Sequence, residues 1–594
     1  MPALLRLLQQ LLLLIAFLLP PSLRRRLLLR RFRPAQARCR AALQAPRDVR
    51  QQTLLAIIEA NRRTEFGRAH GFDQIDSIAA FAARIPLRGY RELEPFILRH
   101  QRGEPGVLVA EALVGLARSG GSRGHPRPVP VTATSLAQWR WAEELLAAAA
   151  INMQPSVARG CVLHVLPSWP AASAPEVNAP RAVATLPLMP LAALAESLGV
   201  TGGLPSALPG ALFTVEDEAA RFRLMLRLAA QRPVTMLRAA SPGTLTLLAE
   251  HLERYGPQLI EDIASGPPPM PQLPQLHRAI AQLRPNRARA ARLRRCLLRS
   301  GRLEPRHLWP QLQLLVCSTD GPSRGAAERL ADRFGSIRLL DPGYRAAEGI
   351  VTLPWHDAEG GPLALAGQFL ELLPEGERTT IEPQELLAGQ RVQIVVTGAN
   401  GLYRYVLDDV MEVGEVRAGV AHLTLRGRAR QRLRLASGLL AEEEVAEAIV
   451  TAARRRQLVL AGYTAWMHTS EERPATPPRR SWLARLLRRE PVAAAPAARL
   501  TVAVEPTAAV TDTEASALSE VLDAELRRAS RAYDEHRGKG ALGAATLLVL
   551  RLGTFARRSH RRLAEGAADG HSPAPALADD EWLLDEGEVI QTVE

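Results

Sequence analysis

The spacing of apolar and polar residues predicts strands that alternate with helices along most of the chain. Short aliphatic or β-branched runs, typical of buried strands, occupy residues 162–165, 234–237 and 312–317. Apolar residues recur at helical spacing in five other segments, over residues 50–62, 134–151, 212–226, 244–255 and 323–334. This alternation predicts an α/β sheet architecture, with Ser135 as a candidate cap of the helix near residue 134.

The character of the sequence changes beyond residue 428. Helices are predicted over residues 442–455 and 513–532, and strands over 458–466, 500–504 and 545–552. We therefore predict an apolar and basic segment at residues 1–40, a large domain over 41–428 and a small carboxyl-terminal domain over 429–594. Within the small domain, residues 470–499 are rich in Pro, Arg and Ala and are predicted to be a disordered insertion. The acidic tail, residues 566–594, is predicted to be frayed.

Composition narrows the class of partner. The 594 residues carry a formal net charge of +14, almost all of it from arginine, since Lys539 is the one lysine. A basic chain suits nucleic acid or an anionic membrane. Neither zinc-finger spacing, an aromatic RNA-binding strand pattern nor a helix-turn-helix signature is present, so we do not expect a nucleic-acid partner. Four widely spaced cysteines suggest no disulfide framework and favour a cytoplasmic setting.

The amino terminus leaves two interpretations open. Residues 11–19 are almost wholly apolar, and Pro20-Pro21 ends this run. Such a run is too short to span a bilayer, which needs roughly 20 residues, and its arginines follow it rather than precede it as in a secretory signal. Residues 1–33 would make a peripheral contact with an anionic membrane, or they would form a helix docked on the protein's own domain.

A hairpin with unusual chemistry is predicted near residue 400. The buried run Val395-Val396-Thr397 precedes a turn at Asn400-Gly401 and a second strand. That strand begins with Tyr403-Arg404-Tyr405 and continues to Asp408-Asp409. Ring faces, a guanidinium and carboxylates suit a nucleotide, because rings flank a base and a carboxylate accepts ribose hydroxyls. The alternative is that these side chains pack and pair within the sheet.

A second candidate is the glycine- and hydroxyl-rich stretch between Ser119 and Arg127, which reads Ser-Gly-Gly-Ser-Arg-Gly-His-Pro-Arg. Successive backbone N–H groups in such a stretch can cradle phosphate oxygens, and hydroxyls add donors. The alternative is a flexible loop before the predicted helix at residue 134. A third candidate site residue is Glu348, which precedes Gly349. The alternative is a turn, because an acidic residue before a glycine is a common feature of turns.

The stretch from Gly401 to Val410 resembles the Gly-Leu-Tyr-Arg-Tyr-x-Leu-Gly-Asp-Val signature of the auxin-responsive (Gretchen Hagen) family of acyl-acid amido synthetases. Further landmarks occur in that family's order, among them Thr64-Glu65-Phe66-Gly67-Arg68, Leu308-Trp309-Pro310 and Phe369-Leu370-Glu371-Leu372-Leu373-Pro374. The resemblance runs from about residue 50 to about residue 565. It implies a large adenylate-forming-type domain with mixed sheets and helices, and a smaller carboxyl-terminal α/β domain.

The resemblance also implies chemistry. Members activate a carboxylic acid with ATP and Mg²⁺ as an acyl-adenylate and transfer the acyl group to an amine, usually an amino acid; a thiol acceptor also stays open. Catalysis would fall to Glu348, which would help to hold Mg²⁺, and to Arg127, which replaces a phosphate-loop lysine. The nucleotide-binding residues would be Ser119, Gly120, Ser122, Gly124, Tyr344, Tyr403, Asp409 and Arg428, with Asp409 on the ribose and Arg428 at the domain hinge.

Several departures from the family pattern support a different hypothesis. Two hydroxyls of the phosphate loop are lost at Gly121 and Arg123, and Ala347 replaces a serine. The family's lysine before a proline near the carboxyl terminus has no counterpart, because the matching position reads His571-Ser572-Pro573. Asp408 and Leu439 replace a glycine and a glutamate. The alternative is therefore a degenerate, non-catalytic relative that binds a ligand, a partner or a membrane.

Overall fold

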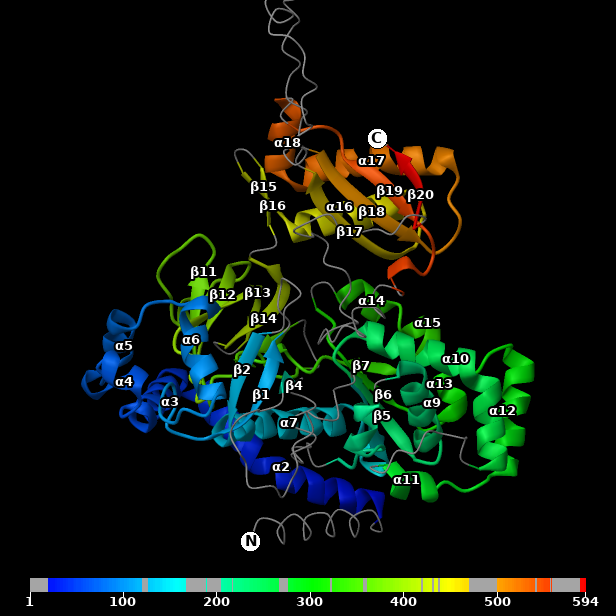
Figure 1. Ribbon diagram of the computed structural model, residues 1–594, viewed down its shortest axis with the longest axis horizontal. Helices are drawn as coiled ribbons and strands as arrows, with labels where there is room; N and C mark the ends of the chain where they lie inside the picture. Colours follow the sequence, from blue (N-terminus) through cyan, green and yellow to red (C-terminus); the bar gives the residue numbers. More distant parts are fainter. Residues whose placement is uncertain are drawn as a thin grey trace, which may run out of the picture. The chain divides into compact units, whose positions relative to one another are not determined.

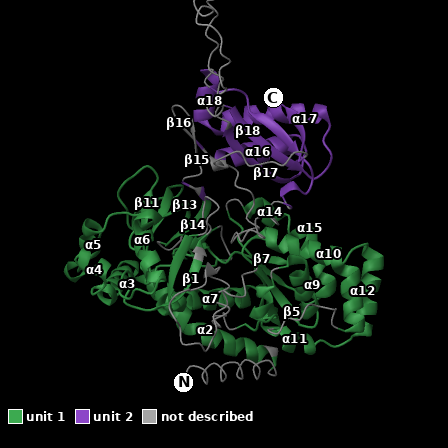
Figure 2. Ribbon diagram, viewed as in Figure 1, with its two compact units in different colours: residues 1–426, 562–571 green, residues 427–561, 572–594 purple. Residues whose placement is uncertain are grey.

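The computed structural model describes most of the chain, namely residues 20–119, 127–166, 188–189, 204–215, 217–266, 276–320, 323–355, 360–417, 420–429, 432–435, 438–468, 499–539, 542–555, 557 and 588–593 (Figure 1). Its contacts divide the chain into a large unit, residues 1–426 with 562–571, and a small unit, residues 427–561 with 572–594 (Figure 2).

A four-stranded parallel sheet forms one half of the large unit. Its strands run in the order β3 (Cys161–Val165), β5 (Val234–Ala239), β6 (Leu314–Val316) and β7 (Arg338–Leu340). The three strands predicted from apolar runs are confirmed, because both faces of this sheet are covered and near-continuous aliphatic runs suit that setting. The helices of this half are α9 (Glu218–Ala229), α10 (Pro242–Ser265), α11 (His277–Ala281), α12 (Arg287–Ser300), α13 (Pro305–Leu308), α14 (Arg324–Glu328) and α15 (Ala331–Phe334).

A second, five-stranded sheet carries the predicted hairpin. The order is β10 (Gly361–Pro362), β14 (Val420–Arg428), β13 (Tyr405–Arg417), β12 (Arg391–Thr397) and β11 (Phe369–Pro374). Strands β12 and β13 are antiparallel, with Val395 opposite Val406, so the hairpin is confirmed. Smaller sheets consist of β2 (Arg127–Thr132), β1 (Leu113–Ser119) and β4 (Leu188–Met189), and of β8 (Arg345–Ala346) with β9 (Gly349–Ile350).

The long helix α7 (Ala133–Met153) begins differently from the prediction. Its N-cap is Thr132, whose hydroxyl accepts from the backbone N–H of Ser135, while the Ser135 hydroxyl accepts from the Thr132 N–H. Ser135 is therefore the reciprocal partner in a capping box and not the cap itself. Strand β2 lies between the glycine-rich stretch and this helix, so the stretch connects two strands, β1 and β2.

The first described helix, α2 (Pro21–Gln44), is docked on the large unit. Leu28, Phe32 and Ala35 are buried along its inner face, and the indole N–H of Trp141 on α7 donates to the Ala35 carbonyl at 3.1 Å. The following helices are α3 (Pro46–Asn61), α4 (Glu65–Ala69), α5 (Ile78–Arg84) and α6 (Tyr90–Gln101). Among the described helices, none combines the length and apolar character that a bilayer crossing requires.

The small unit is an α/β domain with its own core. Its sheet runs in the order β17 (Leu460–His468), β18 (Arg499–Pro506), β19 (Thr546–Leu550) and β20 (Val589–Val593), and helices α16 (Glu442–Arg455), α17 (Asp512–Ala529) and α18 (Arg531–Gly538) accompany it. A short ribbon joins β15 (Arg432–Leu435) to β16 (Gly438–Ala441). The predicted α/β class of this domain is confirmed.

The carboxyl-terminal tail needs a correction. We predicted that residues 566–594 are frayed, but Val589–Val593 form β20, which pairs antiparallel with β19 and places Val593 opposite Leu547. Val589, Ile590, Thr592 and Val593 are β-branched, which favours a strand in spite of the acidic sequence before it. The predicted insertion at residues 470–499 lies, apart from Arg499, outside the described residues.

Candidate functional site

Two predicted site residues meet at the turn that leads into the β8–β9 hairpin. The Tyr344 hydroxyl donates a short hydrogen bond to Oδ2 of Asp409 on β13. The segment before Tyr344 is fixed by Asp341, whose carboxylate accepts from the Thr319 N–H at 2.6 Å and from the Gly343 N–H at 2.8 Å. The backbone of Tyr344 is therefore anchored, and its hydroxyl gives the Asp409 carboxylate a defined position.

Two further predicted residues carry opposite charges near a pair of buried tyrosines. The Arg127 guanidinium lies 5.3 Å from the centre of the Tyr90 ring and interacts with the Tyr405 hydroxyl. Burial raises the pKa of Tyr405, nearby Glu348 and Asp408 raise it further, and Arg127 acts in the opposite direction. Burial also raises the pKa of Tyr90; Glu94 and Glu348 raise it further, and Arg127 lowers it. Arg127 and Glu348 thus belong to one charged cluster.

Strand pairing ties the phosphate-loop candidate to this cluster. Ser119, at the end of β1, is buried and lies directly opposite Arg127, at the start of β2. The connection between them contains Gly120, Ser122 and Gly124, which lie outside the described residues. Both ends of the predicted phosphate-binding stretch are consequently fixed at one position beside Glu348 and Tyr405.

A small pocket adjoins the cluster. It is narrow and partly open to solvent. Its lining residues include Glu348, Ala347 and Asn400, together with Trp139 and Gln138 of α7. The Asn400 side chain donates to the Glu348 carbonyl at 3.2 Å, whereas its buried oxygen Oδ1 has no hydrogen-bond partner among the residues that the structure describes. An unpartnered buried acceptor costs free energy, so a ligand that donates a hydrogen bond here would be stabilised.

Tyr403 and Arg404 do not take the positions that we predicted. The Tyr403 ring is fully buried, stacks on Phe66 with ring centres 4.7 Å apart, and its hydroxyl donates to the Leu108 carbonyl at 2.8 Å. No face of this ring is open to a nucleotide. The packing alternative describes Tyr403 correctly, and the ring contributes to the core beneath the turn.

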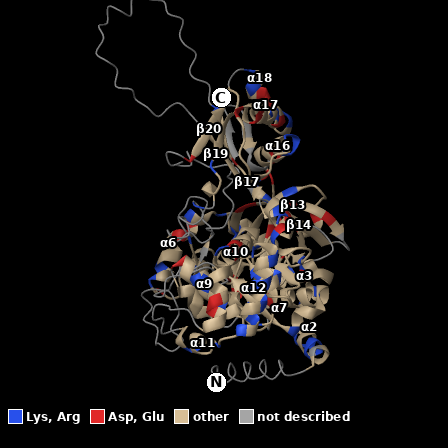
Figure 3. Cartoon of the chain, turned by 90° about the vertical axis from the view of Figure 1, so that its right-hand side faces the viewer, with Lys and Arg blue, Asp and Glu red and all other residues tan. Residues whose placement is uncertain are grey.

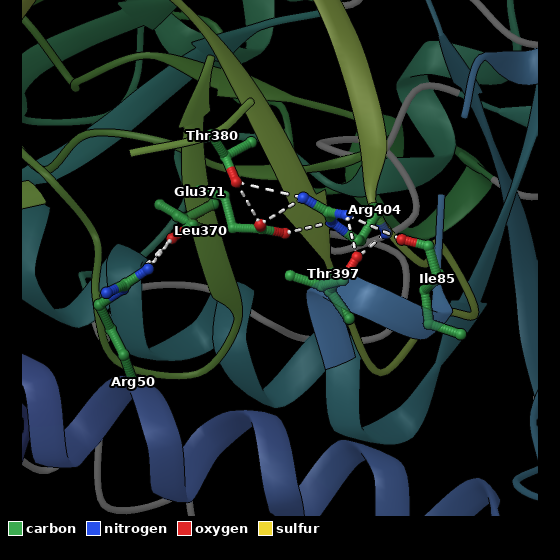
Figure 4. Close-up of polar contacts among 8 residues, drawn as sticks. Arg50, Ile85, Leu370, Glu371, Thr380, Thr397 and Arg404 are labelled. Atoms are coloured by element: carbon green, nitrogen blue, oxygen red, sulfur yellow. Dashed lines mark hydrogen bonds and ion pairs between the residues drawn. The ribbon is translucent and has the colours of Figure 1, made fainter. Parts of the chain in front are cut away.

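Arg404 is the centre of a buried polar network (Figure 4). Its guanidinium makes two bonds to the Glu371 carboxylate, at 3.0 and 2.9 Å, and it donates to the carbonyls of Ala82 and Ile85 at 3.0 and 2.8 Å. Thr380 donates to the same carboxylate at 2.7 Å. Arg404 adopts φ +48°, a left-handed conformation rare outside glycine. The arginine of the signature therefore anchors the hairpin turn to β11 and to the segment after α5.

A second buried network was not predicted. Glu143 on α7 pairs with Arg238 on β5 at 2.6 Å and with Arg345 on β8 at 2.5 Å, next to Tyr344. Burial alone would raise the pKa of Glu143, but the two guanidinium groups outweigh it and lower this pKa to about 2. These residues are 95 and 202 positions apart in sequence from Glu143, so no local pattern could reveal them.

The charged cluster can hold a phosphate-bearing ligand with a divalent cation. Mg²⁺ is usually bound by one or two carboxylates together with substrate phosphates and water, so Glu348 fits that requirement and Arg127 fits a phosphate. No group of three or more His, Cys, Asp or Glu side chains among the described residues could hold a metal ion by itself. Arg428 ends β14, but its side chain lies outside the described part of the structure.

The fold defines an α/β protein with a large unit, which contains this charged cluster, and a small carboxyl-terminal unit. Comparison with known families then identifies its family. The GH3 family N-terminal domain matches residues 35–339, the central domain residues 361–428 and the C-terminal domain residues 443–581. The chain belongs to the GH3 family. The resemblance to the auxin-responsive family and the predicted fold class are confirmed.

Individual relatives are distant. A probable indole-3-acetic acid-amido synthetase of Oryza sativa subsp. japonica is 24% identical over 486 residues, which cover 72% of this chain and 77% of the rice protein. A GH3 domain-containing protein of Homo sapiens is 30% identical over 190 residues, 30% of this chain and 33% of the human protein. The structure of the GH3.15 acyl acid amido synthetase has a TM-score of 0.76 at 17% identity, and the match covers 93% of this chain and 96% of that one.

Proposed function

We propose that this protein is an ATP-dependent ligase that activates a carboxylic acid as an acyl-adenylate and then forms an amide with an amine, an amino acid in the first place. The rice relative is a probable amido synthetase of this kind. The observations that support the proposal are the hydrogen bond from Tyr344 to Asp409 and the position of Arg127 and Glu348 near the same two tyrosines, Tyr405 and Tyr90. A thiol acceptor is the chemical alternative to the amine.

Each residue has a distinct task in the proposed reaction. A carboxylate oxygen of the acid attacks the α-phosphorus of ATP, and pyrophosphate leaves. Arg127 and the backbone N–H groups that follow Ser119 would stabilise the negative charge on the phosphates. Mg²⁺, bound with the phosphates beside Glu348, would neutralise further charge. Asp409, oriented by the Tyr344 hydroxyl, would accept from the ribose hydroxyls. In the second step the amine nitrogen attacks the acyl carbon, AMP leaves and the nitrogen loses a proton.

A specific observation favours the competing hypothesis of a non-catalytic relative. Ala347, which lines the pocket beside Glu348, offers no hydroxyl where the family has a serine. Lys539, the lysine of this chain, caps α18 in the small unit and is not in the sequence position of the family's carboxyl-terminal lysine. Such a protein would bind a ligand in the pocket without forming an adenylate.

Acid-dependent exchange between ATP and labelled pyrophosphate distinguishes the two hypotheses. The full chain is incubated with Mg-ATP and a panel of aromatic, indolic and aliphatic carboxylic acids, with Asp409→Ala as the matched negative control. The ligase hypothesis predicts exchange with at least one acid, and AMP release when amino acids are added. A folded wild type that binds ATP but exchanges no label with any acid would contradict the ligase and support the non-catalytic relative.

A further inference from the structure

Helix α2 is rich in arginine (Figure 3). Its 24 residues include eight arginines and no acidic residue. The arginines whose side chains are exposed are Arg26, Arg30, Arg31, Arg33, Arg38 and Arg40. With about 3.6 residues per turn, Arg26, Arg30, Arg33 and Arg40 fall on one side of the helix, and these four make up the arginine stripe, whereas Arg31 and Arg38 lie to one side of it.

The inner face holds α2 in one orientation. Leu28, Phe32 and Ala35 are buried, with 7%, 0% and 3% of their surfaces exposed. Arg24 is buried as well, and its guanidinium donates to the carbonyls of Ala158 and Arg159, both at 3.2 Å. Because packing and these bonds fix the helix, the exposed arginine stripe is a permanent surface of the large unit.

The protein itself leaves the stripe's charge largely uncompensated. Among the described residues, Arg26, Arg30, Arg33 and Arg40 form no ion pair. Glu144 on α7 lies near Arg31. Burial raises the pKa of Glu144, and the positive charge of Arg31 partly offsets this rise. A surface with this many unpaired guanidinium groups attracts an anionic partner.

Aliphatic side chains at the start of the helix indicate the class of that partner. Leu23 and Leu27 lie one helical turn apart and are 43% and 44% exposed. The sequence immediately before α2, residues 11–19, is almost wholly apolar. Arginines beside exposed leucines suit the boundary between lipid headgroups and acyl chains, whereas the phosphate backbone of a nucleic acid offers leucine no apolar partner.

We propose that α2 is a peripheral attachment surface for an anionic lipid bilayer. The exposed arginines attract the headgroups, and Leu23 and Leu27 enter the interfacial layer. This surface is independent of the charged cluster proposed for catalysis, and it places the large unit at a membrane whatever acid the protein acts on.

Co-sedimentation of the full chain with vesicles tests this surface. The vesicles contain phosphatidylcholine alone or phosphatidylcholine with phosphatidylserine, each at low and high salt. The α2 variant replaces four exposed arginines by glutamine at Arg26, Arg30, Arg33 and Arg40. The matched control removes the same number of charges from the basic helix α12 of the same unit, at Arg287, Arg292, Arg295 and Arg299, which are also exposed. A third variant combines Leu23→Ser with Leu27→Ser.

Wild type is expected to bind the vesicles that contain phosphatidylserine and to lose binding at high salt. The α2 arginine variant should bind them at least roughly 100-fold more weakly, the leucine variant about tenfold more weakly, and the α12 control within about threefold of wild type. An equal loss in the α12 control would overturn the proposal, because total charge and not α2 would then determine binding. Wild type that binds duplex DNA but no vesicles would overturn it as well.

Discussion

The buried pair Arg404–Glu371 gives the sharpest prediction about stability. Both side chains are almost completely buried, at 6% and 3% exposure, and they share two hydrogen bonds. Arg404→Met leaves the Glu371 carboxylate in the core with Thr380 as its remaining donor. Breaking a buried pair by removing one partner costs about 3–5 kcal/mol, since an uncompensated charge remains. Arg404→Met combined with Glu371→Leu should cost clearly less than the sum of the two single variants.

Native-state hydrogen exchange measures this loss locally. Peptides from residues 391–417 should exchange roughly 100- to 5,000-fold faster in Arg404→Met, because opening of the hairpin becomes easier by that free energy. Peptides from α17 in the small unit should not change. Arg391→Met on the neighbouring strand is the matched control, since its 3.7 Å pair with Glu412 is half-exposed and is worth about 0–1 kcal/mol. Strictly additive costs in the double variant would refute the argument from the unpaired charge.

Three further predictions concern the same unit. Glu143→Gln should destabilise the protein by about 3 kcal/mol at pH 7. Because the native pKa of Glu143 is about 2, the extra folding stability of the wild type should be fully present above about pH 4.5 and should fade as the pH falls towards 2. Acid-unfolding curves of the two proteins measure this difference. Tyr344→Phe should weaken ATP binding about tenfold in calorimetry by releasing Asp409, without a change in melting temperature beyond a few degrees. Gly401→Ala should lower the melting temperature more than Gly389→Ala, because both have positive φ but only at Gly401 would a Cβ meet Leu108, at 3.0 Å.

The hairpin shows how much of the site local sequence can predict. The β-branched run before Asn400-Gly401 and the strand after it were recognised because both signals are local. The direction of each side chain could not be predicted from these signals. The left-handed φ of Arg404 interrupts the alternation of a strand, so Tyr403, Arg404 and Tyr405 are all buried in succession. Their partners, Phe66, Glu371 and Ile85, are distant in sequence, so pattern alone could not separate packing from ligand contact.

Two other elements illustrate different limits. Helix α12 was not predicted, although Ala290 and Leu293 are buried at helical spacing, since arginines dominate its sequence. Strand β20 was mistaken for part of a frayed tail, since its pairing with β19 is a tertiary contact. In contrast, Glu348, Tyr344, Asp409 and Arg127 came from ordered family landmarks. The structure joins Tyr344 to Asp409 and puts Glu348 and Arg127 near Tyr405, and the roles of all four stay predictions.

The most direct test of the proposed ligase is calorimetric binding of Mg-ATP to wild type, Asp409→Ala and Glu348→Ala. Glu111→Ala, a half-buried acidic site on the same unit, is the control. The account predicts binding by wild type and the control, and loss of most of the affinity in the other two variants. Undiminished binding in both Asp409→Ala and Glu348→Ala, or no binding by folded wild type, would contradict the assignment of this cluster to ATP.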